Sequence, residues 1–166
     1  AFSPFWDAVA ALQIPVFWVF LGDSPVGGFK EEMGLFRKWL ERYPHIPSVL
    51  VHGLPTALFA DAQDRIIIPD YMLEILRDYP VYSEVLSPIG WGGKSEYPYT
   101  RAQNHIRALY EQLGPDYLIW GSDMPNVERY CTYRQSLSYI EHCDFLGPDD
   151  RRKILGATMR ALCGQT

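Results

Sequence analysis

The stretch Leu118–Leu137, LIWGSDMPNVERYCTYRQSL, passes from an apolar strand to a polar turn within a few residues. Its first residues are aliphatic or aromatic, which is typical of a buried strand. Ser122 and Asp123 end the apolar run, and Pro125 comes before a helical pattern begins. A buried strand that ends on a carboxylate and leads into a helix predicts one unit of an α/β fold. The carboxylate is a candidate functional residue, because parallel α/β folds collect their chemistry at the carboxyl ends of strands.

Three upstream runs share these features, so the sequence predicts four strands. Each run is bounded by Gly or Pro and is nearly continuous in apolar character, which is typical of strands covered on both faces of a parallel sheet. The runs start at regular intervals, about one strand–helix unit apart. The predicted strands are Ile14–Leu21, Ile46–His52, Val81–Ser87 and Tyr117–Gly121.

Helical patterns separate these strands, with apolar residues recurring every three or four positions. Strands joined by helices on a right-handed path are parallel, so we predict an α/β fold over one domain, residues 1–166. Four such units cannot close a (β/α)8 barrel, so the chain is either a small open α/β sheet or half of a barrel with exposed edges. The predicted helices are Ala1–Leu12, Phe29–Tyr43, Asp70–Tyr79, Arg101–Leu113, a segment around Tyr133–Ile140, and a last helix opened by Gly147–Asp150.

Composition excludes several classes of partner. The net charge is −5 and the pI is near 5.3, which argues against non-specific binding to nucleic acid or to an anionic membrane. No apolar run reaches the roughly 20 residues that a transmembrane helix needs. The three cysteines show no CxxC spacing, and their odd number favours a reducing compartment, so we expect a cytoplasmic protein. Neither GxGxxG nor a P-loop follows the first strand.

Two strand endings carry strong functional side chains. His52 closes the second predicted strand and Asp123 closes the fourth. Taken singly, each has an ordinary explanation, since a strand-end histidine can bond to the backbone and an aspartate before x-Pro often initiates a turn or caps a helix. Together they favour function, because an imidazole and a carboxylate can hold a divalent metal or transfer protons. Asn126 and Arg129 follow Asp123 and either contact an acidic substrate or belong to the helix surface.

The remaining titratable residues give weaker signals. Glu84 lies inside the third strand, and a buried carboxylate there needs a partner. Cys131 has no assignable base, which argues against thiol catalysis. We interpret the other histidines as structural. They are His45, before the second strand, His105, within a helix, and His142, near a helix end.

The segments IPSVLVHGLP, LIWGSDMP and CDFLGPDDRRKILGATMRALCG resemble the amidohydrolase-2 family of metal-dependent TIM-barrel hydrolases, which also includes aromatic-acid decarboxylases. The resemblance covers nearly the whole chain but only the C-terminal half of a family member. It implies that the four strands are the fifth to eighth of the barrel. It also implies that His52 orients water or substrate, and that Asp123 is a metal ligand and proton shuttle. The implied cofactor is a divalent metal, zinc first and manganese or iron as alternatives.

Two departures from the family pattern shape the functional expectation. The first-strand H-x-H or E-x-H pair is absent, and Val19, Phe20 or Leu21 stands where the fifth-strand histidine should fall. A site with so few ligands binds metal poorly. We therefore expect an incomplete enzyme part that acts on a small-molecule substrate and is completed by an N-terminal half or another protein chain.

Two alternatives stay open. One is a non-catalytic, degenerate half-barrel subunit. The other is a free-standing binding domain in which His52 and Asp123 hold a small polar ligand. In the half-barrel case, the first and fourth strands would present unpaired edges, so the chain is not expected to be a stable monomer.

Overall fold

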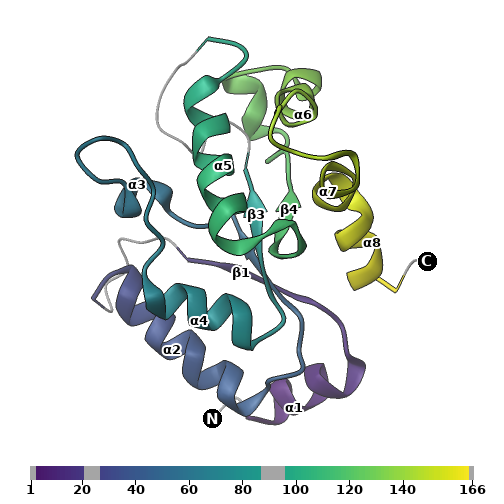
Figure 1. Ribbon diagram of the computed structural model, residues 1–166. Coiled ribbons are helices and arrows are strands. Elements are labelled where there is room, and N and C mark those ends of the chain that lie inside the picture. Colours follow the sequence, from purple (N-terminus) through teal and green to yellow (C-terminus); the bar gives the residue numbers. More distant parts are fainter. Residues whose placement is uncertain (1–2, 21–26, 87–95, 165–166) are drawn as a thin grey trace.

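A single four-stranded parallel sheet, in the order β1-β2-β3-β4, lies at the centre of the computed structural model, which describes residues 3–20, 27–86 and 96–164 (Figure 1). All four predicted strands are present, in shorter form. Leu21 and Ser87, at the ends of two predicted ranges, lie outside the described residues. The strands are β1 (Val16–Val19), β2 (Ser48–Val51), β3 (Val81–Val85) and β4 (Leu118–Trp120).

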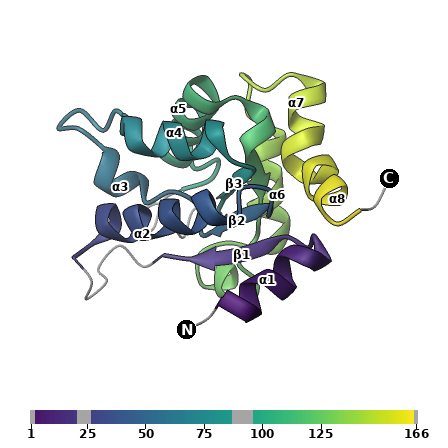
Figure 2. The ribbon, with the colours of Figure 1, turned by 90° about the horizontal axis from the view of Figure 1, so that it is seen from below.

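Helices connect each strand to the next. The three long connecting helices lie on one face of the sheet (Figures 1 and 2). The short helix that follows β2 was not predicted, because its four residues are too few to show helical periodicity. The connecting helices are α2 (Phe29–Arg42), α3 (Thr56–Phe59), α4 (Asp70–Asp78) and α5 (Thr100–Leu113). The flanking ones are α1 (Ser3–Leu12), α6 (Tyr133–Glu141), α7 (Pro148–Arg152) and α8 (Thr158–Leu162). Shorter turns are η2 (Pro115–Tyr117), η3 (Asn126–Arg129) and the π-helical η4 (Lys153–Ala157).

The core fills the space between the sheet and this helical layer. The apolar residues that recur at helical spacing along α2 are buried, and so are those along α5. These side chains pack against the strand residues that point the same way, in one continuous cluster. Its members include Phe29, Met33, Phe36 and Leu40 from α2, Ala102, Ile106, Leu109 and Leu113 from α5, and Leu50, Val81, Val85 and Leu118 from the strands. Burial of this area is the main stabilising contribution to the fold.

The opposite face of the sheet is less covered, especially at β1. Trp18 points into the helical layer, where its ring lies 5.1 Å from that of Phe36. Because side chains alternate along a strand, Phe17 and Val19 point the other way, and they are 52% and 53% exposed. Val49, the partner of Phe17 in β2, is only 1% exposed. The uncovered apolar surface of this face is therefore concentrated on the first strand.

Within the described residues, β1 and β4 each pair with one strand only, so they are the two edges of the sheet, as the half-barrel prediction requires. The segments η4 and α8 lie against β4, and Figure 1 shows α8 beside it. These helical segments pack beside β4 but add no strand to it, so its edge stays unpaired in the described residues. At the other edge, α1 lies beside β1, and the Trp6 ring stacks on the Trp18 ring at 5.4 Å.

The arrangement decides between the two architectures left open by the sequence. A doubly wound open sheet carries helices on both faces, whereas a (β/α)8 barrel carries them only outside. Here α2, α4 and α5 share one face, so the chain is a partial TIM barrel of four βα units (Figure 2). Within the described part of the chain, no helix has the length and apolar character needed to cross a membrane.

Candidate functional site

Two of the sequence-predicted site residues follow strand ends at the same edge of the sheet. His52 comes directly after β2, and Asp123 comes three residues after β4. Both have left-handed backbone conformations, with φ of 66° and 53°. Residues other than glycine seldom adopt such conformations, and those that do are often found at functional sites. Because the strands are parallel, their carboxyl ends form one rim, and both residues lie on it.

Glu84 of β3 joins these two residues. Its Oε2 accepts a hydrogen bond from the backbone N–H of His52 at 2.6 Å. Burial raises the pKa of the Glu84 carboxyl above its usual range; the hydrogen bond from His52 opposes this rise, and the charge of Asp123 adds to it. The Glu84 carboxyl is thus hydrogen-bonded to the backbone of His52, while the like charge of Asp123 disfavours its ionised form. Sequence reasoning had noted Glu84 but could not tell which face of the sheet it occupies.

Asp123 is partly buried, and its contacts are local. Its Oδ1 accepts a hydrogen bond from Asn126 Nδ2 at 3.3 Å, and its carbonyl oxygen accepts one from the N–H of Val127 at 3.1 Å. The following helix, α6, is capped by Thr132 in a capping box with Gln135. The cap of α6 is therefore supplied without Asp123, and Asn126 is the predicted neighbour that the structure brings to its carboxylate.

Arg129 lies apart from this group. It is exposed in η3 and lines a shallow groove with Tyr130 and Cys131. In the described ranges, no contact joins it to His52 or Asp123. Cys131 is buried, and burial raises the pKa of its thiol, which disfavours the reactive thiolate.

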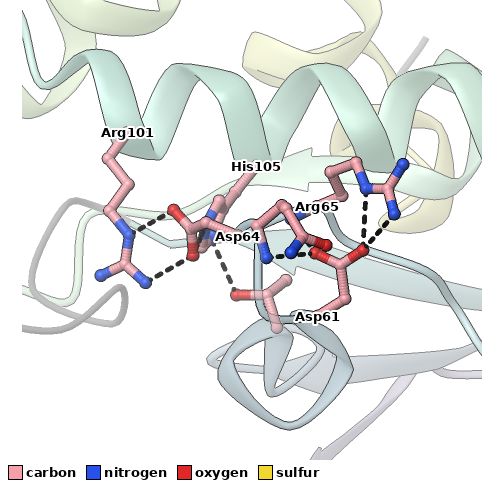
Figure 3. A network of polar contacts seen from close by, with 7 residues as sticks. Asp61, Asp64, Arg65, Arg101 and His105 are labelled. Carbon is pink, nitrogen blue, oxygen red and sulfur yellow. Dashed lines mark hydrogen bonds and ion pairs between the residues drawn. The ribbon is translucent and has the colours of Figure 1, made fainter.

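The other histidines lie away from the rim chemistry. His105 is 1% exposed on α5, with Nδ1 3.2 Å from Thr56 Oγ1 and Nε2 3.5 Å from Asp64 Oδ1. Figure 3 shows Asp64 between His105 and Arg101, whose guanidinium donates to both of its carboxylate oxygens at 2.8 Å. Arg101 lowers the pKa of Asp64 to about 2. This network attaches the segment after β2 to α5.

The donor set tests whether this chain can hold a metal by itself. Among residues 3–20, 27–86 and 96–164, no group of three or more His, Cys, Asp or Glu side chains could hold a metal ion. At the fifth-strand position, Val19 and Phe20 carry no donor atom, and Leu21 lies outside the described residues. The described residues therefore do not form a metal site on their own.

Comparison with known proteins identifies the family. A sequence model of the amidohydrolase family matches residues 1–163. The chain belongs to the amidohydrolase family. An L-fucono-1,5-lactonase of Burkholderia ambifaria is 30% identical over 122 residues, which are 69% of this chain and 40% of the lactonase.

Solved structures share the fold at lower identity. A crystal structure of an amidohydrolase from Burkholderia multivorans with bound HEPES has a TM-score of 0.70 at 18% identity, and the match covers 98% of this chain and 58% of that one. The same protein was also solved with bound zinc. A dihydroxybenzoic acid decarboxylase from Polaromonas sp. JS666, with bound manganese and 2-nitroresorcinol, has a TM-score of 0.54 at 16% identity, over 96% of this chain and 52% of that one.

These matches bear on the predicted fold and cofactor. The chain spans 40% of the lactonase and little more than half of each of these solved relatives, as a partial barrel should. The relatives include both hydrolases and decarboxylases, and zinc and manganese both occur among them. A divalent metal is thus present in structural relatives of this amidohydrolase, while the described residues hold too few donors to bind one.

Proposed function

We propose that this amidohydrolase chain carries part of the active site of a metal-dependent hydrolase that acts on a small organic substrate. The site lies at the carboxyl-terminal rim of the barrel, and the four strands are the fifth to eighth of that barrel. One observation carries the proposal. His52 and Asp123, from strands two units apart, follow the ends of strands at one rim, and the backbone N–H of His52 donates to the carboxylate of Glu84 on the strand between them.

His52 and Asp123 have distinct roles in this proposal. Asp123 is the proton-transferring carboxylate and the one metal ligand that this chain contributes. His52 orients water or substrate beside it. Asn126 holds the Asp123 carboxylate through its amide, and Arg129 contacts the substrate from the following turn. The remaining metal ligands belong to the complement of the barrel, so we derive no reaction step through the metal from these residues.

The helices at the two edges indicate what the complement looks like. A (β/α)8 barrel has one helix at each junction between strands. Here α1 lies beside β1 and α8 lies against β4, so each end of the sheet already has its helix. A second copy of this chain would bring two helices to each junction. The complement that fits is a segment that begins and ends with a strand, with four strands and three helices, in the same polypeptide or in another.

One specific observation favours a second candidate, a non-catalytic half-barrel subunit. The position expected for the fifth-strand histidine carries Val19 or Phe20 within the described residues, and neither side chain can hold a metal. A decarboxylase of the same family is the alternative within the enzyme class.

Activity of the assembled protein tests the proposal. A panel of sugar lactones, including L-fucono-1,5-lactone, is assayed with zinc or manganese and again after chelation. We expect chelator-sensitive hydrolysis that falls about 100-fold or more in Asp123→Asn and His52→Asn. The matched control is His45→Asn, an exposed histidine that precedes β2 rather than following it, and it keeps wild-type activity.

Three results would overturn the proposal. Full activity in both variants would remove these residues from the chemistry. Release of carbon dioxide from aromatic acids without lactone hydrolysis would establish the decarboxylase. A folded, metal-loaded assembly that is inactive in both assays would establish the non-catalytic subunit.

A further inference from the structure

Glu84 occupies an unusual place for a carboxylate. It lies in β3, and its neighbours Ser83 and Val85 are buried toward the helical layer. Strand alternation therefore points Glu84 to the opposite face, which it shares with its β4 partner Ile119. Ile119 is only 2% exposed and Glu84 itself is partly buried, so the surroundings of the carboxylate must supply polar partners.

Those surroundings include the ends of both neighbouring strands. On the β2 side, Glu84 Oε2 accepts the N–H of His52 at 2.6 Å. On the β4 side, Glu84 Oε1 lies so close to Gly121 that any Cβ there would overlap it. The carboxylate therefore spans the interval between β2 and β4, and its two oxygens face different strands.

Two glycines lie against Glu84, one against its backbone and one against its side chain. Gly53 has φ of 72°, and a Cβ on it would overlap the backbone carbonyl oxygen of Glu84. At Gly121, the absence of a Cβ leaves the space that the Glu84 side chain occupies. These close approaches lie directly after His52 and directly before Ser122, at the start of the segment that carries Asp123. An aspartate at position 84 would be one methylene shorter and could not make the same span.

We propose that Glu84 is a positioning residue of the rim. By accepting the His52 N–H, it holds His52 in the left-handed conformation that sets the direction of its imidazole. By filling the space over Gly121, it fixes the backbone that leads to Asp123. The catalytic meaning of this positioning rests on the function proposed above, whereas the connection of the three strand ends does not. A residue that served packing alone would leave the turnover of the site unchanged when it was replaced without loss of fold.

The His52 amide reports the connection directly, without any substrate. Amide exchange and chemical shift are measured by NMR in wild-type protein, Glu84→Gln and Glu84→Ala. The glutamine variant keeps an acceptor oxygen and should keep the protection of His52. The alanine variant loses the acceptor, and protection of that amide should fall by about tenfold or more, the loss expected for a hydrogen bond to a charged group. Glu111→Gln, on the exposed surface of α5, is the matched control and leaves the amide unchanged. An unchanged His52 amide in folded Glu84→Ala overturns the proposal.

A double-mutant cycle that combines Gly121→Ala with Glu84→Ala gives a second test. In the wild-type background, Gly121→Ala should displace the carboxylate and expose the His52 amide to exchange, as Glu84→Ala does. In the Glu84→Ala background, the added methyl has room, so Gly121→Ala should change His52 exchange less than about twofold further. Equal effects of Gly121→Ala in both backgrounds would show that Glu84 does not mediate them and would contradict the proposal.

Kinetics separate this proposal from the proposed function. If the assembled wild-type protein hydrolyses its substrate, Glu84→Ala should lower kcat more than tenfold with little change in KM, and Glu84→Gln should recover part of the loss. Unchanged kcat in an alanine variant whose His52 amide has lost protection would refute the positioning role. If the wild-type protein is inactive, the proposed function fails, and the amide measurements still decide whether Glu84 connects the strand ends.

Discussion

The half-exposed apolar residues of β1 make a quantitative prediction about association. Phe17 and Val19 are 52% and 53% exposed on the face away from the helical layer. Burying a whole Val or Phe side chain stabilises by roughly 1.5–3 kcal/mol, so covering the exposed half of each contributes about 1 kcal/mol. Replacing both residues with threonine, which suits a strand, should therefore weaken association of this chain with the complement of the barrel by about 2 kcal/mol, or roughly 30-fold in Kd.

Sedimentation equilibrium of this chain mixed with its barrel complement, over a range of concentrations, measures this change. The matched control replaces Leu58 and Ile67 with threonine. Each is 60% exposed, but both lie in the segment between β2 and α4, away from the edge at β1. The control should associate like the wild-type chain, and circular dichroism should show that both double variants stay folded.

Two outcomes would refute this reasoning. The first is an unchanged Kd in the Phe17→Thr/Val19→Thr variant. The second is a wild-type chain that stays folded and monodisperse at 19.1 kDa in the presence of its complement, which would mean that the complement does not occupy the exposed face.

Three further predictions concern stability. Asp123→Asn should change the free energy of unfolding by no more than about 1 kcal/mol in chemical denaturation, since asparagine is tolerated in turns and caps nearly as well as aspartate; a larger loss would mean that Asp123 serves the fold. Burial lowers the pKa of His105, so the unfolded chain binds more protons than the folded one once the pH falls below the ordinary histidine pKa of about 6.5. The contribution of neutral His105 to the free energy of unfolding is thus present above that pH and lost below it. In His105→Gln, the urea midpoint should therefore fall less steeply between pH 7.5 and pH 5 than in wild-type protein. An equally steep fall would contradict this. Gly53→Ala should destabilise the fold by about 1–3 kcal/mol, because φ at Gly53 is 72° and the added methyl would overlap the Glu84 carbonyl oxygen. Gly34→Ala, in α2 with open space around it, should instead stabilise the fold by about 0.5–1 kcal/mol in the same assay.

Much of the fold could be predicted because each element carries its own local signal. The four strands are continuous apolar runs, and the stripe of Phe29, Met33, Phe36 and Leu40 repeats at helical spacing. The strands were predicted too long because apolar residues that flank them, such as Ile14, Phe20 and Leu86, continue the apolar pattern beyond the paired residues. The contact of η4 and α8 with β4 joins distant parts of the chain, and no local pattern encodes it.

The sequence predicted where the rim residues lie, but not the contacts of Glu84 that link the neighbouring strand ends. His52 and Asp123 follow strand ends, and parallel strands bring such ends together. Glu84 was harder, because a run such as VYSEV at Val81–Val85 does not reveal which alternate residues face the helices. The glycines at positions 53 and 121 were the available signal, since they mark close approaches, but only the structure shows that both approaches are to Glu84.

Metal content of the assembled protein tests the central claim, a metal-dependent site shared between this chain and its complement. Zinc and manganese are measured by inductively coupled plasma mass spectrometry in the wild-type assembly, in Asp123→Asn, and in this chain alone. The expected result is retained metal in the wild-type assembly, strong depletion in Asp123→Asn, and none held by the isolated chain, in which the described residues offer no three-donor cluster. Equal metal in the wild-type and Asp123→Asn assemblies, or a wild-type assembly that holds no divalent metal, would contradict it.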